Sequence, residues 1–249
     1  QWIRSISGSP PTIYLGYQTA SGLQVRSYQA SDLTAISAEE TLSNATRAKF
    51  GNPIIDATSS EILIPVLNID NKSDAVITYD STLTTDTQFT SCRSPQSIGI
   101  DYAGASRYRY IFCAQNKIIQ IRDTSNVLIT SISAGTFPKQ MVVGSDGTNR
   151  FISVLQTNNR ITLHQFALAQ SPIIPTTTTV DLPGNGIALS QYIGSGVAAD
   201  QLLVTIPENN ALSVLDLGAQ TLSSTLIFPK SIDSIAAVSS SLLYFVSSN

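Results

Sequence analysis

Residues 138–163 read PKQMVVGSDGTNRFISVLQTNNRITL. A proline precedes a short apolar stretch, a glycine-containing turn, and two further apolar stretches joined through Asn158 and Asn159. Runs rich in Val, Ile and Thr that are bounded by turn residues predict β-strands, and an asparagine-containing connection predicts a hairpin. The stretch therefore predicts consecutive antiparallel strands.

The same pattern recurs along the chain at a nearly constant spacing. Pro53, Pro95, Pro138, Pro183 and Pro229 are 42, 43, 45 and 46 residues apart, and each precedes a similar apolar stretch. A period of about 40–45 residues with four strands in each repeat is typical of β-propeller blades. The sequence predicts an all-β protein, a β-propeller of about six four-stranded blades, or seven if the chain is a fragment of a longer protein.

Each repeat contains a hairpin formed by its second and third strands. The predicted pairs are 61–67 with 75–79, 108–114 with 118–121, 150–155 with 160–163, and 202–206 with 211–215. An acid follows the third strand at Asp80, Asp123 and Asp216, and Gln165 takes this place in the remaining repeat. Threonine-rich fourth strands at 84–90, 128–133, 176–182 and 221–228 are expected at water-facing edges.

We expect residues 1–249 to form a single domain, with an N-terminal blade in residues 1–50. The predicted strands of that blade are 2–6, 12–19, 23–29 and 33–36. The last repeat supplies two strands, 232–238 and 242–246. The chain begins at Gln1 rather than Met and lacks the pattern of a signal peptide, which favours a processed or excised chain.

The composition argues against nucleic acid and membrane insertion. The net charge is -3, charged residues make up 12% of the chain, and no block of like charges is present. Nucleic-acid binding needs a basic surface, and a membrane-spanning helix needs about 18 or more apolar residues in a row. A surface of Ser, Thr and Asn instead favours an extracellular, cell-surface or periplasmic location.

The two cysteines are predicted to form a disulfide. Cys92 stands just before the first strand of its repeat, and Cys113 near the end of the second strand. Antiparallel pairing brings these two positions side by side, within the reach of a disulfide. Two buried free thiols are the alternative. A bridge would indicate an oxidising compartment outside the cytoplasm.

Residues that could carry chemistry are few, and no catalytic, cofactor-binding or metal-ligating set is predicted. His164 is the only histidine, and no G-x-S-x-G nucleophile motif is present. Asp56 and Asp101 end the first strands of two repeats and are candidates for the rim of the propeller channel; solvation of the strand ends is the alternative. Asn44 and Asn71 begin matches to the N-glycosylation pattern.

The repeats resemble the YVTN-type β-propeller family of prokaryotic surface-layer and lactonase-like proteins. Residues 135–154 are similar to its glycine-x-x-proline start with an Asp-Gly turn. Residues 202–216, LLVTIPENNALSVLD, and 109–123, RYIFCAQNKIIQIRD, are similar to its Tyr-Val-Thr-Asn strand and asparagine-rich hairpin. No repeat contains the full signature, and the resemblance concerns architecture rather than function.

The function that the sequence favours is a non-enzymatic binding or assembly module on a cell surface or filament, acting on a protein partner or on copies of itself. A lactonase-like hydrolase using Asp56 or Asp101 is one alternative. A carbohydrate-binding propeller is another, since exposed aromatic residues are common at recognition surfaces. The aromatic residues of the N-terminal half are Trp2, Tyr14, Tyr17, Tyr28, Tyr102, Tyr108 and Tyr110.

Overall fold

The computed structural model describes residues 2–6, 11–20, 22–43, 48–56, 58–67, 74–84, 86–90, 92–101, 107–145, 148–168, 174–192, 201–239 and 242–246. Within these residues the regular structure is β, apart from one 3₁₀ turn at Pro207–Asn209. No helix in this part of the chain has the length and apolar composition needed to cross a bilayer. The all-β prediction is confirmed.

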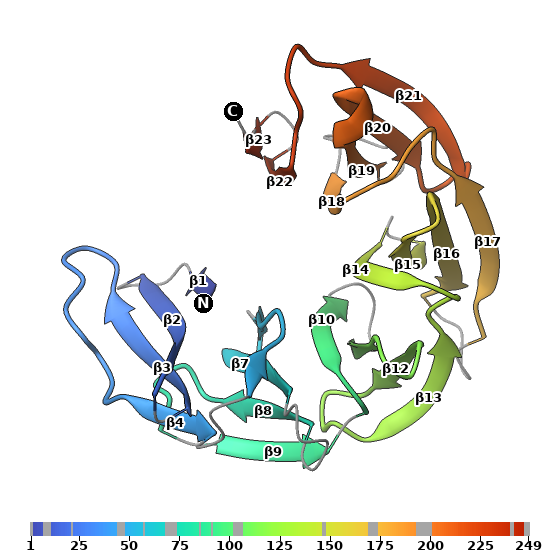
Figure 1. Cartoon of the computed structure of the whole chain (residues 1–249). Helices are drawn as coiled ribbons and strands as arrows, with labels where there is room; N and C mark the ends of the chain where they lie inside the picture. The colour runs from blue at the N-terminus through green and yellow to red at the C-terminus, as the bar shows by residue number, and fades with distance from the viewer. Residues whose placement is uncertain are drawn as a thin grey trace. The chain divides into compact units, whose positions relative to one another are not determined.

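The strands form successive antiparallel sheets in chain order (Figure 1). Two compact units are present, Gln1–Ile100 with Arg109–Ile132, and Asp101–Tyr108 with Ser133–Asn249. The first sheet contains β1 (Trp2–Ile6), β2 (Thr12–Thr19), β3 (Gly22–Gln29) and β4 (Glu40–Ser43). The second contains β5 (Lys49–Phe50), β6 (Ile54–Asp56), β7 (Glu61–Leu67), β8 (Ala75–Tyr79) and β9 (Asp86–Thr90), with β5 and β6 both pairing with β7.

The remaining described sheets repeat the same order. They are β10 (Pro95–Asp101), β11 (Tyr108–Cys113), β12 (Ile118–Arg122) and β13 (Leu128–Ser133); β14 (Pro138–Ser145), β15 (Asn149–Gln156), β16 (Arg160–Ala167) and β17 (Thr176–Asp181); β18 (Ala188–Tyr192), β19 (Gln201–Ile206), β20 (Ala211–Asp216) and β21 (Thr221–Ile227); and β22 (Ser234–Ser239) with β23 (Leu242–Val246). Successive four-stranded antiparallel sheets are the building units of a propeller.

The hairpins predicted from the sequence lie at the predicted positions because local turn chemistry specifies them. The residue directly before the third strand has a positive φ at Lys117 (56°), Asn159 (59°) and Asn210 (49°). This left-handed conformation is the one that asparagine tolerates better than most residues, so the asparagines end the turn and begin the third strand.

The acid that follows the third strand also has a local role. The Oδ1 atom of Asp80 accepts hydrogen bonds from the amides of Thr82 and Thr84, at 3.0 and 3.1 Å. Asp123 accepts equivalent bonds from Ser125 and Val127, both at 2.9 Å. Burial opposes ionisation of Asp80, but the hydrogen bonds from Thr82 and Thr84 outweigh it and lower its pKa to about 2. These carboxylates fix the turn into the fourth strand.

The fourth strand of the N-terminal sheet is not where the sequence placed it. Residues 33–36 were expected to form this strand, whereas the structure has it at Glu40–Ser43. Leu33 takes a positive φ of 58°, and the chain turns back at this point. The amide of Ile36 then donates to the carbonyl of Ser27 at 2.9 Å. The predicted segment therefore forms a loop that lies along β3.

Each unit has its own apolar core. In the first unit, side chains of the N-terminal sheet such as Leu23 and Val25 pack against Ile62 and Ile64 of β7, and all four are fully buried. The second unit has a larger cluster of buried apolar side chains, which consists of Phe151, Leu155, Ile161, Leu163, Leu182, Leu189, Leu202, Val204, Ile206, Ala211, Leu215 and Leu217. Side chains alternate between the two faces of a strand, so every second residue can point into such a cluster and be buried there.

A disulfide joins Cys92 to Cys113, with Cα atoms 5.9 Å apart. Cys92 precedes β10 and Cys113 ends β11, as the predicted pairing of these strands required. Cys113 is fully buried in a cluster with Leu63, Val76 and Ile111. The bridge therefore joins the start of β10 to the end of β11, at the end of this hairpin opposite the connection between the two strands.

We expect removal of this bridge to lower the free energy of unfolding by about 3 kcal/mol, because a cross-link over 21 residues restricts the unfolded chain. Denaturant unfolding of the oxidised protein and of a Cys92→Ala/Cys113→Ala variant measures the difference. Reductant should lower the midpoint of the wild type and leave that of the variant unchanged. An unchanged wild-type midpoint in reductant would contradict the prediction.

Candidate functional site

The two acids that the sequence offered as rim candidates are both buried. Asp56 ends β6 and is 0% exposed, and Asp101 ends β10 and is 2% exposed. Neither carboxylate solvates the end of its strand. Each instead pairs with an arginine at the second position of a later strand, Arg109 on β11 and Arg150 on β15.

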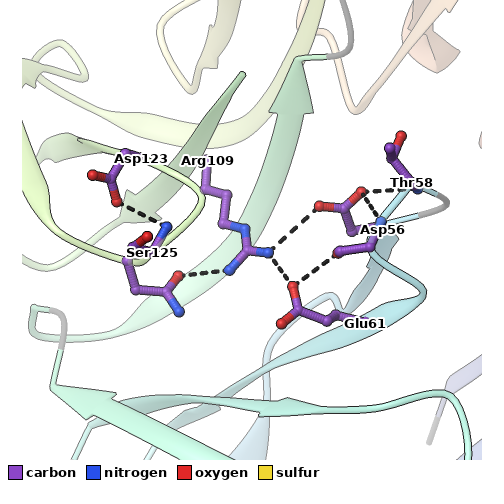
Figure 2. Close-up of polar contacts among 8 residues, drawn as sticks. Asp56, Thr58, Glu61, Arg109, Asp123 and Ser125 are labelled. Atoms are coloured by element: carbon purple, nitrogen blue, oxygen red, sulfur yellow. Dashed lines mark hydrogen bonds and ion pairs between the residues drawn. The ribbon is translucent and has the colours of Figure 1, made fainter. Parts of the chain in front are cut away.

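Arg109 is the centre of a polar cluster in the first unit (Figure 2). Its Nη2 atom lies 3.5 Å from Oδ2 of Asp56 and also donates to Glu61. Its Nη1 atom donates to Oδ1 of Asn126 at 2.9 Å. The Arg109 side chain is 1% exposed, while that of Glu61 is 34% exposed and Asn126 is half-buried, so the cluster reaches the surface at these two partners.

The partners of Arg109 are themselves held in place. Oδ1 of Asp56 accepts hydrogen bonds from the amides of Thr58 and Ser59, at 3.1 and 3.4 Å. Asn126 belongs to the turn that Asp123 fixes, and its φ is 65°. Figure 2 shows Arg109 reaching between Asp56 and Glu61 on one side and this turn on the other. The cluster therefore links the sheet of β6 and β7 to the sheet of β11.

Arg150 repeats this arrangement in the second unit. Its Nε atom donates to Asp101, and its Nη1 atom donates to the carbonyl of Leu168 at 2.8 Å. The guanidinium carbon lies 4.8 Å from the centre of the Tyr108 ring. The side chains of both members of the ion pair are 1% exposed. A planar guanidinium that stacks on a ring and bonds a carboxylate is geometry that lysine cannot supply.

This arrangement is suited to holding strands together rather than to turnover. A carboxylate that bonds an arginine and backbone amides has few lone pairs left to take up a proton or bind a metal ion. Within the described residues, no group of three or more His, Cys, Asp or Glu side chains could hold a metal ion. Asp56 and Asp101 therefore act as buried counter-charges in this structure.

Sequence reasoning found the acids but missed the arginines. The repeat could have revealed the arginines, because each is the second residue of the second strand in its repeat. These strands begin with Tyr108-Arg109-Tyr110 and Asn149-Arg150-Phe151. Each arginine pairs with the acid of the preceding repeat, about 50 residues earlier in the chain. At the next equivalent positions, the end of β14 and the second position of β19, the chain has Ser145 and Leu202, which carry no charge.

The other singled-out residues lie apart from these clusters. Asn44, Asn71 and Tyr102 are outside the described residues, so glycosylation of the two asparagines stays a prediction. Tyr14 and Tyr110 are core residues, at 1% and 0% exposure.

His164 is buried at 3% exposure on β16. Its Nδ1 atom lies 3.0 Å from Oγ1 of Thr177. Burial lowers the pKa of His164 below the ordinary value of 6.5, although the backbone of Ser133 opposes this shift. The imidazole is therefore neutral at neutral pH.

The comparisons with known proteins give a fold and no family. No protein-family model matches the chain, and no curated protein matches it. A solved structure of virginiamycin B lyase from Staphylococcus aureus, a catalytically inactive H270A form with quinupristin, is similar with a TM-score of 0.67 and 13% identity, over 97% of this chain and 75% of that one.

Two further solved structures have the same likeness. BBS1N in complex with ARL6DN has a TM-score of 0.65 and 13% identity, over 94% of this chain and 70% of that one. Hydrazine synthase of Kuenenia stuttgartiensis has a TM-score of 0.62 and 9% identity, over 95% of this chain and 80% of that one. Proteins of such different function share only the architecture. The chain is an all-β protein with the β-propeller fold.

Replacing Arg109 with methionine is expected to destabilise the protein by about 3–5 kcal/mol, because it leaves the buried Asp56 carboxylate without its counter-charge. The matched control is Arg160→Met, which breaks an ion pair with Asp181 whose members are 52% and 76% exposed. That change should be worth less than about 1 kcal/mol. Denaturant unfolding measures both, and equal losses would contradict a structural role for Arg109.

The stability of the protein is also expected to fall as the pH is lowered from about 6.5. In that range the unfolded chain protonates His164, while the folded chain, with its lowered pKa, does so only at lower pH. Protons therefore favour the unfolded state. Urea unfolding between about pH 5 and 7 should show this slope in the wild type and a flatter one in His164→Gln. Identical slopes would count against the burial effect.

Proposed function

We propose that this chain is a non-enzymatic β-propeller module that acts outside the cytoplasm and assembles with further copies of itself through its sheet edges. The observation that carries the proposal is the composition of two terminal strands, β13 and β21. Both are free of charged residues and carry exposed apolar side chains. Natural proteins usually protect such edges with charge.

The contrast with the last strands of the three other sheets that have four or more strands supports this choice. β4, β9 and β17 each contain one carboxylate, namely Glu40, Asp86 and Asp181. β13 contains none, and Leu128 and Ile129 at its start are 46% and 43% exposed, next to Val127 at 59%. In β21, Leu226 and Ile227 are 49% and 71% exposed.

The pairing pattern indicates how association would occur. β13 and β21 are the last strands of their sheets, so one side of each backbone has no neighbouring strand among the described residues. A strand from another chain can add to such an edge through main-chain hydrogen bonds, and apolar side chains add buried area. Pairing β13 of one copy with β21 of the next is heterologous, and repetition of this contact builds a filament or a ring.

Two further features support a place outside the cytoplasm. The bridge between Cys92 and Cys113 belongs to an oxidising environment. The surface carries hydroxyl and amide groups in place of charge, with charged residues at 12% of the chain. An extracellular, cell-surface or periplasmic location fits both features. The resemblance of the repeats to the YVTN type, which includes surface-layer proteins, supports the same location.

The lactonase-like alternative would need Asp56 or Asp101 as an accessible acid or base. Both carboxylates are buried and paired with arginines. The likeness to a lyase structure at 13% identity concerns the fold alone. Asp56 and Asp101 are better suited to holding neighbouring strands together through these arginines.

Size-exclusion chromatography with light scattering tests the assembly. The wild type should show a concentration-dependent mass above the 26.6 kDa of one chain. Ile129→Lys on β13 and Ile227→Lys on β21 should each weaken association at least about tenfold, since a charge between paired strands is poorly solvated. Thr179→Lys on the exposed part of β17 is the matched control. A wild type that stays monomeric at its highest soluble concentration would contradict the proposal.

A further inference from the structure

The N-terminal sheet has two faces of different character. One face points to the core. Its residues are buried and lie opposite each other in β2 and β3, such as Tyr14 with Ser27 and Gly16 with Val25. Leu15 pairs with Arg26 and therefore stands on the opposite face, where both are half-buried. Residues directly opposite in an antiparallel pair share a face, so this second face combines apolar, aromatic and charged groups.

Tyr17 and Tyr28 stand on this second face, opposite Gln24 and Ile13 respectively. Both tyrosines are half-buried, which leaves part of each ring in contact with solvent. Tyr14, the other tyrosine of this sheet, is a core residue at 1% exposure. Tyr17 and Tyr28 are therefore the accessible tyrosines among the side chains that the structure describes in this sheet.

Polar groups hold the two rings in place. The Tyr17 hydroxyl donates to Oε2 of Glu39, and this hydrogen bond is the main cause that raises the pKa of Tyr17 to about 12. The guanidinium carbon of Arg26 lies 5.7 Å from the centre of the Tyr28 ring. Its Nε atom donates to the carbonyl of Ser37 at 3.3 Å. A neutral hydroxyl, a carboxylate and a guanidinium are therefore gathered around the two rings.

The loop at residues 30–39 builds one wall of this region. The amide of Ser27 donates to Oγ of Ser37 at 3.1 Å, and the amide of Ile36 donates to the carbonyl of Ser27 at 2.9 Å. The loop is thus fastened along β3 and carries Glu39 to Tyr17. It also exposes Leu33 at 65% and Ile36 at 48%. Loops held on a rigid sheet are where binding residues are most often found.

We propose that this face binds a carbohydrate, with Tyr17 and Tyr28 as stacking platforms and Arg26 and Glu39 as hydrogen-bonding groups. A pyranose ring presents C–H groups on one face, which pack on an aromatic ring, and hydroxyls on its edge. Adjacent hydroxyls need both donors and acceptors, which the guanidinium and the carboxylate supply. The two side-chain charges cancel, which suits a neutral sugar. This site is separate from the edge strands of the proposed assembly and does not rest on it.

An array of neutral plant, fungal and bacterial oligosaccharides, probed with the oxidised full chain, tests the site. We expect binding to at least one class of glycan, and a loss of about tenfold or more in Tyr17→Ala or Tyr28→Ala, since each removes a stacked ring. Tyr28→Phe keeps the ring and should retain binding. Phe137→Ala removes an exposed aromatic side chain elsewhere, 52% exposed, and is the matched control.

Thermal unfolding of each variant tests whether the variant keeps the fold. Ile227→Lys should still bind the glycan, so failure of the assembly proposal and failure of this one are distinguishable. Three results would overturn the inference: no glycan bound by the wild type, equal binding by the wild type and both alanine variants, or loss of self-association in the alanine variants. The last would show that this face contacts protein.

Discussion

The buried pair of Asp56 and Arg109 is the constraint on which the first unit depends. Apolar packing between two sheets has no direction, so it alone leaves the sheets free to slide. Arg109 removes this freedom because its donors are fixed in one plane and engage Asp56, Glu61 and Asn126 from three different segments. A shift of one sheet would leave a charge buried without its partner, which is far less favourable than a lost apolar contact.

This role changes how the acids at the strand ends are understood. From the sequence, a carboxylate at the end of a first strand suggested a site at the rim of the propeller channel. In this structure Asp56 and Asp101 face arginines of later strands. The groups that are accessible lie elsewhere, on the terminal strands β13 and β21 and on the tyrosine-bearing face of β2 and β3. These accessible groups are the ones on which the two proposals of binding rest.

The sequence predicted the elements that local rules determine. β7, β8, β13 and β23 have the predicted bounds, because alternation and turn residues act over a few positions. The strand expected at 33–36 was wrong, since the positive φ of Leu33 is set by hydrogen bonds back to β3 rather than by residue type. The arginine partners were missed for a related reason, because contacts across about 50 residues leave no local pattern.

Residue differences at equivalent positions of the repeats indicate where the blades have different local requirements. Equivalent positions of a propeller have similar surroundings, so a change at one of them reflects a local requirement. The acid and the arginine recur at two sheet junctions. At the next equivalent positions Ser145 and Leu202 replace them, and neither side chain carries a charge. By the same reasoning, the carboxylates of β4, β9 and β17 show that a charged terminal strand is compatible with the fold, and the proposed self-association offers a reason for their absence from β13 and β21. Contact with another molecule is such a reason, since a charge buried at that contact would weaken it.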